Sequence, residues 1–144
     1  MNSDFIALLR ELSAAEARFL VVGAYAVTFH SRPRATGDLD LWVEPTAENA
    51  ARVIRALRAF GAPLQDLSEA DLRTPGMVYQ IGVPPRRVDL LTSLTGLEFT
   101  EAWRERVTGR MGDLECPFIG RAQLIHNKRA LGRPRDLADL ELLG

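Results

Sequence analysis

The sequence has little cysteine and no long apolar run, and each shortage excludes a class of protein. Cys116 is the only cysteine among 144 residues, so the chain forms no intrachain disulfide and no metal site built from several cysteines. No run approaches the about eighteen apolar residues that cross a membrane. Residues 1–10 lack the basic start and apolar stretch of a secretory signal. We therefore expect a cytoplasmic protein that makes no membrane contact.

An excess of charge of one sign is also lacking. The 18 basic residues nearly balance 19 acidic ones, which leaves a formal net charge of −1 and argues against a strong non-specific grip on long nucleic acid. Lys128 is the only lysine, and the other basic residues are arginines, whose planar forks suit phosphate and carboxylate groups. Genome composition can produce the same bias, so arginine content alone assigns no site.

Length, apolar spacing and turn residues predict one domain over residues 1–144, in which helices alternate with strands. Helices are expected over residues 3–13, 24–30, 47–60, 68–72, 98–106, 122–131 and 135–143. Strands are expected over residues 19–22, 38–43, 77–83, 87–92, 107–111 and 114–119. This order favours an α/β (α+β) fold, a mixed sheet backed by helices, with short helices at its C-terminal end.

Two aspartates one residue apart are the main candidates for chemistry. Asp38 and Asp40 alternate with Leu39 and Leu41, and residues i and i+2 of a strand share a face, so both carboxylates are expected on one face. Carboxylates this close repel unless a cation or protons intervene. Asp89 lies in a later apolar strand, where a charge is costly unless it is balanced. If the two strands are neighbours, three carboxylates converge and can hold Mg²⁺ or Mn²⁺.

A glycine turn stands upstream of the aspartates. Gly23 ends an apolar run and starts a short helix, and backbone N–H groups at a helix start attract phosphate. The segments 22–27 (VGAYAV) and 38–41 (DLDL), with His30, Arg34 and Thr36 between them, resemble the opening motif of the DNA polymerase beta-like nucleotidyltransferase superfamily. They are most similar to its small stand-alone bacterial members, the minimal nucleotidyltransferases and the relatives of AbiEii-type toxins.

The resemblance implies a nucleotidyltransferase-like fold and a Mg²⁺-dependent enzyme that moves a nucleoside monophosphate from a nucleoside triphosphate to a hydroxyl. It implies that Asp38 and Asp40 ligate the metal that carries the nucleotide, and that Asp89 completes the catalytic metal site. Gly23 would let the backbone approach the triphosphate. Ala24 replaces the usual glycine or serine and so removes a hydroxyl contact. Lesser candidates for nucleotide contacts are Arg34, Thr36 and Lys128.

The acceptor is left open by the sequence. It can be a protein hydroxyl, a tRNA end or a small molecule, and the short chain leaves acceptor binding to a second copy or to a partner protein. Toxin–antitoxin roles are common among the small relatives that the chain resembles. The chief alternative is a nucleotidyltransferase-like binding module or antitoxin that binds nucleotide without turnover, and Ala24 favours it. A metal-dependent phosphatase or nuclease is less favoured, because the chain has no histidine cluster.

Some of the acidic residues also have plainer interpretations. Asp89 can be an edge-strand carboxylate that pairs with Arg86 or Arg87. Asp136 and Asp139 lie three residues apart near the start of the last expected helix. We expect them to favour that helix start or to pair with nearby arginines, rather than to bind metal. The nearby arginines are Arg133 and Arg135.

Overall fold

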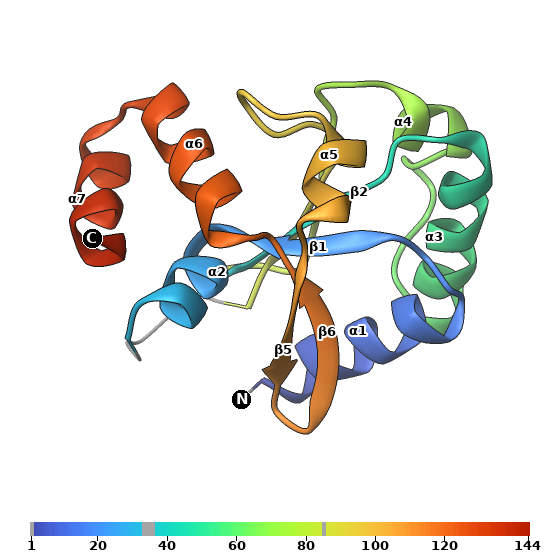
Figure 1. Cartoon of the computed structure of the whole chain (residues 1–144). Helices are drawn as coiled ribbons and strands as arrows, with labels where there is room; N and C mark the ends of the chain where they lie inside the picture. Colours follow the sequence, from blue (N-terminus) through green and yellow to red (C-terminus); the bar gives the residue numbers. More distant parts are fainter. Residues whose placement is uncertain (1, 33–36, 85) are drawn as a thin grey trace.

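The computed structural model describes residues 2–32, 37–84 and 86–144, and in these ranges helices alternate with the strands of a six-stranded mixed sheet (Figure 1). The helices are α1 Ser3–Ala14, α2 Gly23–His30, α3 Ala47–Phe60, α4 Glu69–Arg73, α5 Phe99–Arg104, α6 Arg121–Leu131 and α7 Pro134–Leu143. The strands are β1 Phe19–Val22, β2 Leu39–Val43, β3 Val78–Ile81, β4 Val88–Leu91, β5 Val107–Met111 and β6 Leu114–Phe118. The expected α/β class is confirmed, and each element ends within a residue or two of its expected position.

Local sequence signals explain where the longer helices begin and end. The side-chain oxygen of Asn2 accepts hydrogen bonds from the backbone N–H groups of Asp4 and Phe5, which caps α1. Thr46 caps α3 in the same way. The last turn of α3 closes at Gly61, whose φ of 93° lies in the left-handed region that suits glycine. These ends are therefore determined by residues close to them in sequence.

The sheet has the strand order β3-β4-β2-β1-β6-β5. β1 runs antiparallel to β2 and parallel to β6, β2 runs parallel to β4, and the pairs β3–β4 and β5–β6 are antiparallel. β4 thus lies inside the sheet, so the interpretation of Asp89 as an edge-strand residue is wrong. The expectation that Asp38 lies within a strand is also wrong, because β2 begins at Leu39.

The central strands are buried because helices cover the sheet. All four residues of β1 are buried, and the core also takes in Leu39, Leu41 and Trp42 of β2. Burying an apolar side chain of this size contributes about 1.5–3 kcal/mol. Figure 1 shows α2, α6 and α7 gathered at one end of β1, with α3 and α4 at the other end.

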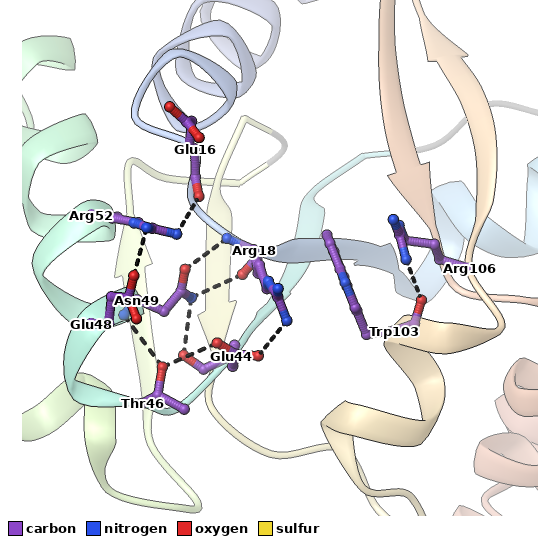
Figure 2. Close-up of polar contacts among 9 residues, drawn as sticks. All are labelled: Glu16, Arg18, Glu44, Thr46, Glu48, Asn49, Arg52, Trp103 and Arg106. Carbon is purple, nitrogen blue, oxygen red and sulfur yellow. Dashed lines mark hydrogen bonds and ion pairs between the residues drawn. The ribbon is translucent and has the colours of Figure 1, made fainter.

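A hydrogen-bond network closes the end of β1 next to α3 (Figure 2). Asn49 is 1% exposed; its side-chain oxygen accepts from the Arg18 N–H at 2.7 Å, and its amide donates to the carbonyls of Arg18 and Glu44, each at 3.0 Å. Figure 2 shows Trp103 between the side chains of Arg18 and Arg106. The Asn49 side chain is thus fully engaged by the backbone at this end, and the candidate site lies at the opposite end of β1.

Candidate functional site

Gly23 begins α2 with its backbone directly against the Asp40 carboxylate. The β1–β2 register pairs Val22 with Asp40, so the next residue along the chain lies beside that side chain. The φ of Gly23 is +66°, and a Cβ at this position would overlap Asp40 Oδ2. Both observations require glycine here. The absence of a side chain at Gly23 thus makes room for the Asp40 carboxylate, and the expected approach of a triphosphate to this backbone stays a prediction.

The parallel pairing of β2 with β4 brings a second aspartate beside Asp40. Asp40 and Asp89 occupy the same register position, so both side chains leave the sheet on the same face. Asp38 directly precedes β2, and its Oδ1 accepts a hydrogen bond from the backbone N–H of Arg87 at 3.0 Å. The three aspartates that the sequence singled out therefore lie on neighbouring segments.

The surroundings of Asp40 disfavour its charge. Burial, and after it the negative charges of Asp89 and Asp38, raise the pKa of Asp40 to about 6. The positive charges of Lys128 and Arg87 lower the pKa but do not cancel the effect of burial. A cation bound next to Asp40 would relieve this conflict.

Arg87 is a cation at the site that the motif did not include. Its Nε donates to Asp89 Oδ1 at 2.8 Å, and its Nη2 donates to Asp89 Oδ2 at 3.2 Å. The same Nη2 lies 3.5 Å from Asp38 Oδ2. The hydrogen bond to Asp89 raises the pKa of Arg87. The expected pairing of Asp89 with a neighbouring arginine is confirmed, although inside the sheet.

The carboxylates do not form a ready metal cage. Within residues 2–32, 37–84 and 86–144, no group of three or more His, Cys, Asp or Glu side chains is gathered closely enough to hold a metal ion. Arg87 instead engages two of the three aspartates. A divalent cation at this position would therefore require these side chains to adjust and the guanidinium to move.

A cavity of about 230 Å³ opens beside Gly23 and Asp40. Its walls combine apolar side chains with polar and basic groups from β4, the segment after β4, α6 and the start of α7; the polar and basic residues are Ser93, Thr95, Asn127, Lys128 and Arg133. The amide of Asn127 is 4% exposed and donates to the carbonyl of Thr95 at 3.0 Å. The lining of the cavity thus includes one carboxylate, Asp40, and two cationic side chains, Lys128 and Arg133.

Lys128 is held at this cavity by a buried ionic network. Its Nζ lies 3.3 Å from Asp136 Oδ1 and 3.1 Å from Asp139 Oδ2. Arg133 donates to Asp136 through Nε at 2.6 Å, and this bond is the main reason that the pKa of Asp136 falls to about 2. The expected pairing of Asp136 with an arginine is confirmed. Lys128 was a candidate for nucleotide contacts, but its burial and its pairing with Asp136 and Asp139 were not expected, although Lys128 follows Leu124 at the four-residue spacing of a buried helix face.

Of the remaining candidates, two precede Asp38 in the sequence and one lies on α2. Arg34 and Thr36 lie outside the described residues. Ala24 is the second residue of α2 and is partly buried. Val22, the N-cap of α2, provides no side-chain hydrogen bond to the first turn. Within the described residues, no side chain caps the N–H groups of that turn, which lies beside the cavity.

Comparisons with known proteins add no assignment. No protein-family model matches the chain, and no curated protein shows a significant match. Among the helices in the described part of the chain, none combines the length and apolar character that crossing a bilayer demands.

Proposed function

We propose that this protein is a divalent-metal-dependent nucleotidyltransferase that moves a nucleoside monophosphate from a nucleoside triphosphate to an acceptor hydroxyl. The observation that carries the proposal is the contact between Gly23 and Asp40 next to Asp89. It combines a helix start, which suits phosphate oxygens, with paired carboxylates, which suit a hard cation. The cavity beside this contact has room for part of a nucleotide.

The side chains at the site fit Mg²⁺ or Mn²⁺ in chemical type. Asp38, Asp40 and Asp89 offer only carboxylate oxygens, which are the donors that these cations prefer. The pKa of Asp40 is raised by burial and by the neighbouring negative charges, and a bound cation would offset both effects. Bound there, a divalent cation would neutralise triphosphate charge and acidify the attacking hydroxyl.

The chain's own groups would bind and orient the substrate. The uncapped N–H groups of the first turn of α2 would donate to phosphate oxygens, and Gly23 lets the phosphate approach the backbone. Lys128 and Arg133, which line the cavity, would supply positive charge on the other side of the triphosphate. Asp89 would accept the proton of the acceptor hydroxyl at its carboxylate. Positioning and charge neutralisation are what phosphoryl transfer mainly requires.

Calorimetric titration with each nucleoside triphosphate in the presence of Mg²⁺ tests the binding half of the proposal. Wild-type protein should bind at least one nucleotide, Asp40→Asn should lose most of that affinity, and Asp113→Asn should retain it. Asp113 lies in the exposed turn between β5 and β6, so it is a chemically matched control. Absence of metal-dependent binding to any of the nucleotides would overturn the proposal.

Transfer is tested by incubation with nucleotides labelled at the α-phosphate, together with separate protein, tRNA and small-molecule fractions of a cell lysate. The expected result is a labelled acceptor and released pyrophosphate, both lost in Asp89→Asn. If a second copy of the chain completes the acceptor site, the transfer rate per molecule of protein should rise with protein concentration. If a partner protein completes it, transfer should depend on the added fraction.

The second candidate function is a binding module that holds nucleotide without transfer. Ala24 supplies no hydroxyl to a phosphate at the start of α2, and Arg87 engages two of the three carboxylates; both observations favour this alternative. Tight nucleotide binding that is lost in Asp40→Asn, together with no transfer to any fraction, would support the module and exclude the enzyme.

A further inference from the structure

Arg87 is fixed to the candidate site by both its backbone and its side chain. The backbone N–H donates to Asp38 Oδ1 at 3.0 Å, and the backbone carbonyl accepts from the Leu39 N–H at 2.9 Å. The guanidinium then spans Asp89, at 2.8 Å and 3.2 Å, and Asp38, at 3.5 Å. One residue therefore joins the segment before β2 to β4 on the side where the carboxylates lie.

The guanidinium engages oxygens that a divalent cation would need. Both oxygens of Asp89 accept from Arg87, and Asp38 Oδ2 faces the same Nη2. A carboxylate oxygen that accepts from a guanidinium is a weaker ligand for a metal ion, and two cations held by the same carboxylates repel each other. Pairing with Arg87 and binding of a divalent cation thus compete for Asp38 and Asp89.

We propose that Arg87 is a positioning residue, an internal counterion that keeps Asp38 and Asp89 assembled and gives way when a divalent cation binds. This inference rests on the proposed function, since it concerns the same carboxylates. The role of Arg87 can fail while the proposed function stands, because a metal site without an exchangeable counterion would serve that function equally well.

Exposure and anchoring explain how Arg87 can give way without disturbing the sheet. The Arg87 side chain is 28% exposed, so the guanidinium has solvent beside it. The Arg87 N–H donates to Asp38 Oδ1 and the Arg87 carbonyl accepts from the Leu39 N–H, and neither bond depends on the Arg87 side chain. A side chain that leaves the carboxylates therefore keeps the register of β2 and β4, and the same holds for a variant that lacks the guanidinium.

If Arg87 competes with the metal, removing its charge should raise the affinity for a divalent cation, whereas a purely structural ion pair predicts no such increase. Arg87→Gln removes the competing charge, so the affinity for a divalent cation should rise, about fivefold if the pair has the strength of a partly exposed ion pair. Arg87→Lys keeps the charge but loses the two-point geometry, so its affinity should lie between those of the wild type and Arg87→Gln. Without metal, both variants should unfold more easily.

The matched control is Arg86→Gln. Arg86 is the neighbouring residue and is exposed. No ion pair of its side chain is found in the described part of the chain. The same substitution there should leave cation affinity and stability close to those of the wild type.

Titration with Mn²⁺ alone, followed by electron paramagnetic resonance of the free ion, measures the affinity directly. Thermal unfolding with EDTA and with saturating Mg²⁺ gives an independent readout. The inference is supported if Arg87→Gln binds Mn²⁺ more tightly than wild type and Arg86→Gln does not. The rise in melting temperature on adding Mg²⁺ should also be larger in Arg87→Gln than in the wild type.

Equal or weaker Mn²⁺ binding by Arg87→Gln overturns the inference, while wild-type binding that is lost in Asp40→Asn leaves the proposed function standing. If no variant binds Mn²⁺ at millimolar concentration, both the inference and the proposed function fall. Should Arg87→Gln not fold, Arg87→Lys decides alone, and an affinity equal to that of the wild type rejects the competition.

Discussion

Replacing Asp40 by asparagine is expected to stabilise the metal-free protein at neutral pH. The pKa of Asp40 is about 6 in the folded protein, against an ordinary value of 3.8. At a pH low enough for Asp40 to be protonated in both the folded and the unfolded chain, its carboxyl group makes no pH-dependent contribution to the free energy of unfolding. As the pH rises, the unfolded chain loses this proton first, so the free energy of unfolding falls until the pH exceeds the folded-state pKa. Each pH unit between the two values corresponds to about 1.4 kcal/mol, which gives roughly 3 kcal/mol, or about 2 kcal/mol after screening by solvent.

Urea unfolding in EDTA, monitored by circular dichroism, measures this effect. At about pH 8 the free energy of unfolding of Asp40→Asn should exceed that of the wild type by about 2 kcal/mol, and near pH 4 the difference should be small. Asp113→Asn should match the wild type at both values. Added Mg²⁺ should stabilise the wild type and not Asp40→Asn. If Asp40→Asn is no more stable than the wild type at the higher pH, the reasoning about burial and repulsion at this site is refuted.

Three further substitutions test other parts of the structure. Gly23→Ala should lower the free energy of unfolding by about 1–3 kcal/mol and weaken nucleotide binding, because the added Cβ overlaps Asp40 and the backbone is left-handed; urea unfolding and calorimetry measure the two effects. Asp136→Asn should cost about 3 kcal/mol because it leaves the buried Lys128 with less countercharge. In the wild type this stabilisation should fade as the pH drops below the ordinary carboxyl pKa of 3.8 towards about 2, which acid unfolding measures. Asn49→Ala should cost about 1–3 kcal/mol, because the Arg18 N–H loses its partner while the carbonyls of Arg18 and Glu44 keep their backbone hydrogen bonds (Figure 2), and Mn²⁺ affinity should be unchanged in the folded variant.

The elements could be predicted because their signals are local. The apolar run before Gly23, the helix stop at Gly61 and the alternation around Asp40 each lie within a few residues of the structure that they determine. The order of the strands could not be predicted in this way. It depends on pairings such as β1 with β6, whose residues Val21 and Phe118 are far apart in sequence, and nothing in either segment specifies the other.

The charges at the site were only partly predictable for the same reason. Arg87 and Asp89 are two residues apart on one extended segment, so their pairing could be expected from spacing. The contact of Arg87 with Asp38 needs the β2–β4 pairing. The influence of Lys128 on Asp40 needs α6 to pack against the sheet. Spacing therefore identified the acidic groups, and tertiary packing determined which cations face them.

The two ends of β1 differ in how well the fold accommodates the polar side chains that lie there. At the end next to α3, Asn49 is a buried neutral amide that makes three hydrogen bonds with the backbone. At the end next to α2, the partly buried side chain is a carboxylate whose charge is opposed by burial and by two other carboxylates. A neutral amide would relieve this opposition, so packing alone gives no reason for a carboxylate there. A cation and its phosphate-bearing ligand would supply that reason, since the charge that destabilises the free protein would stabilise the complex.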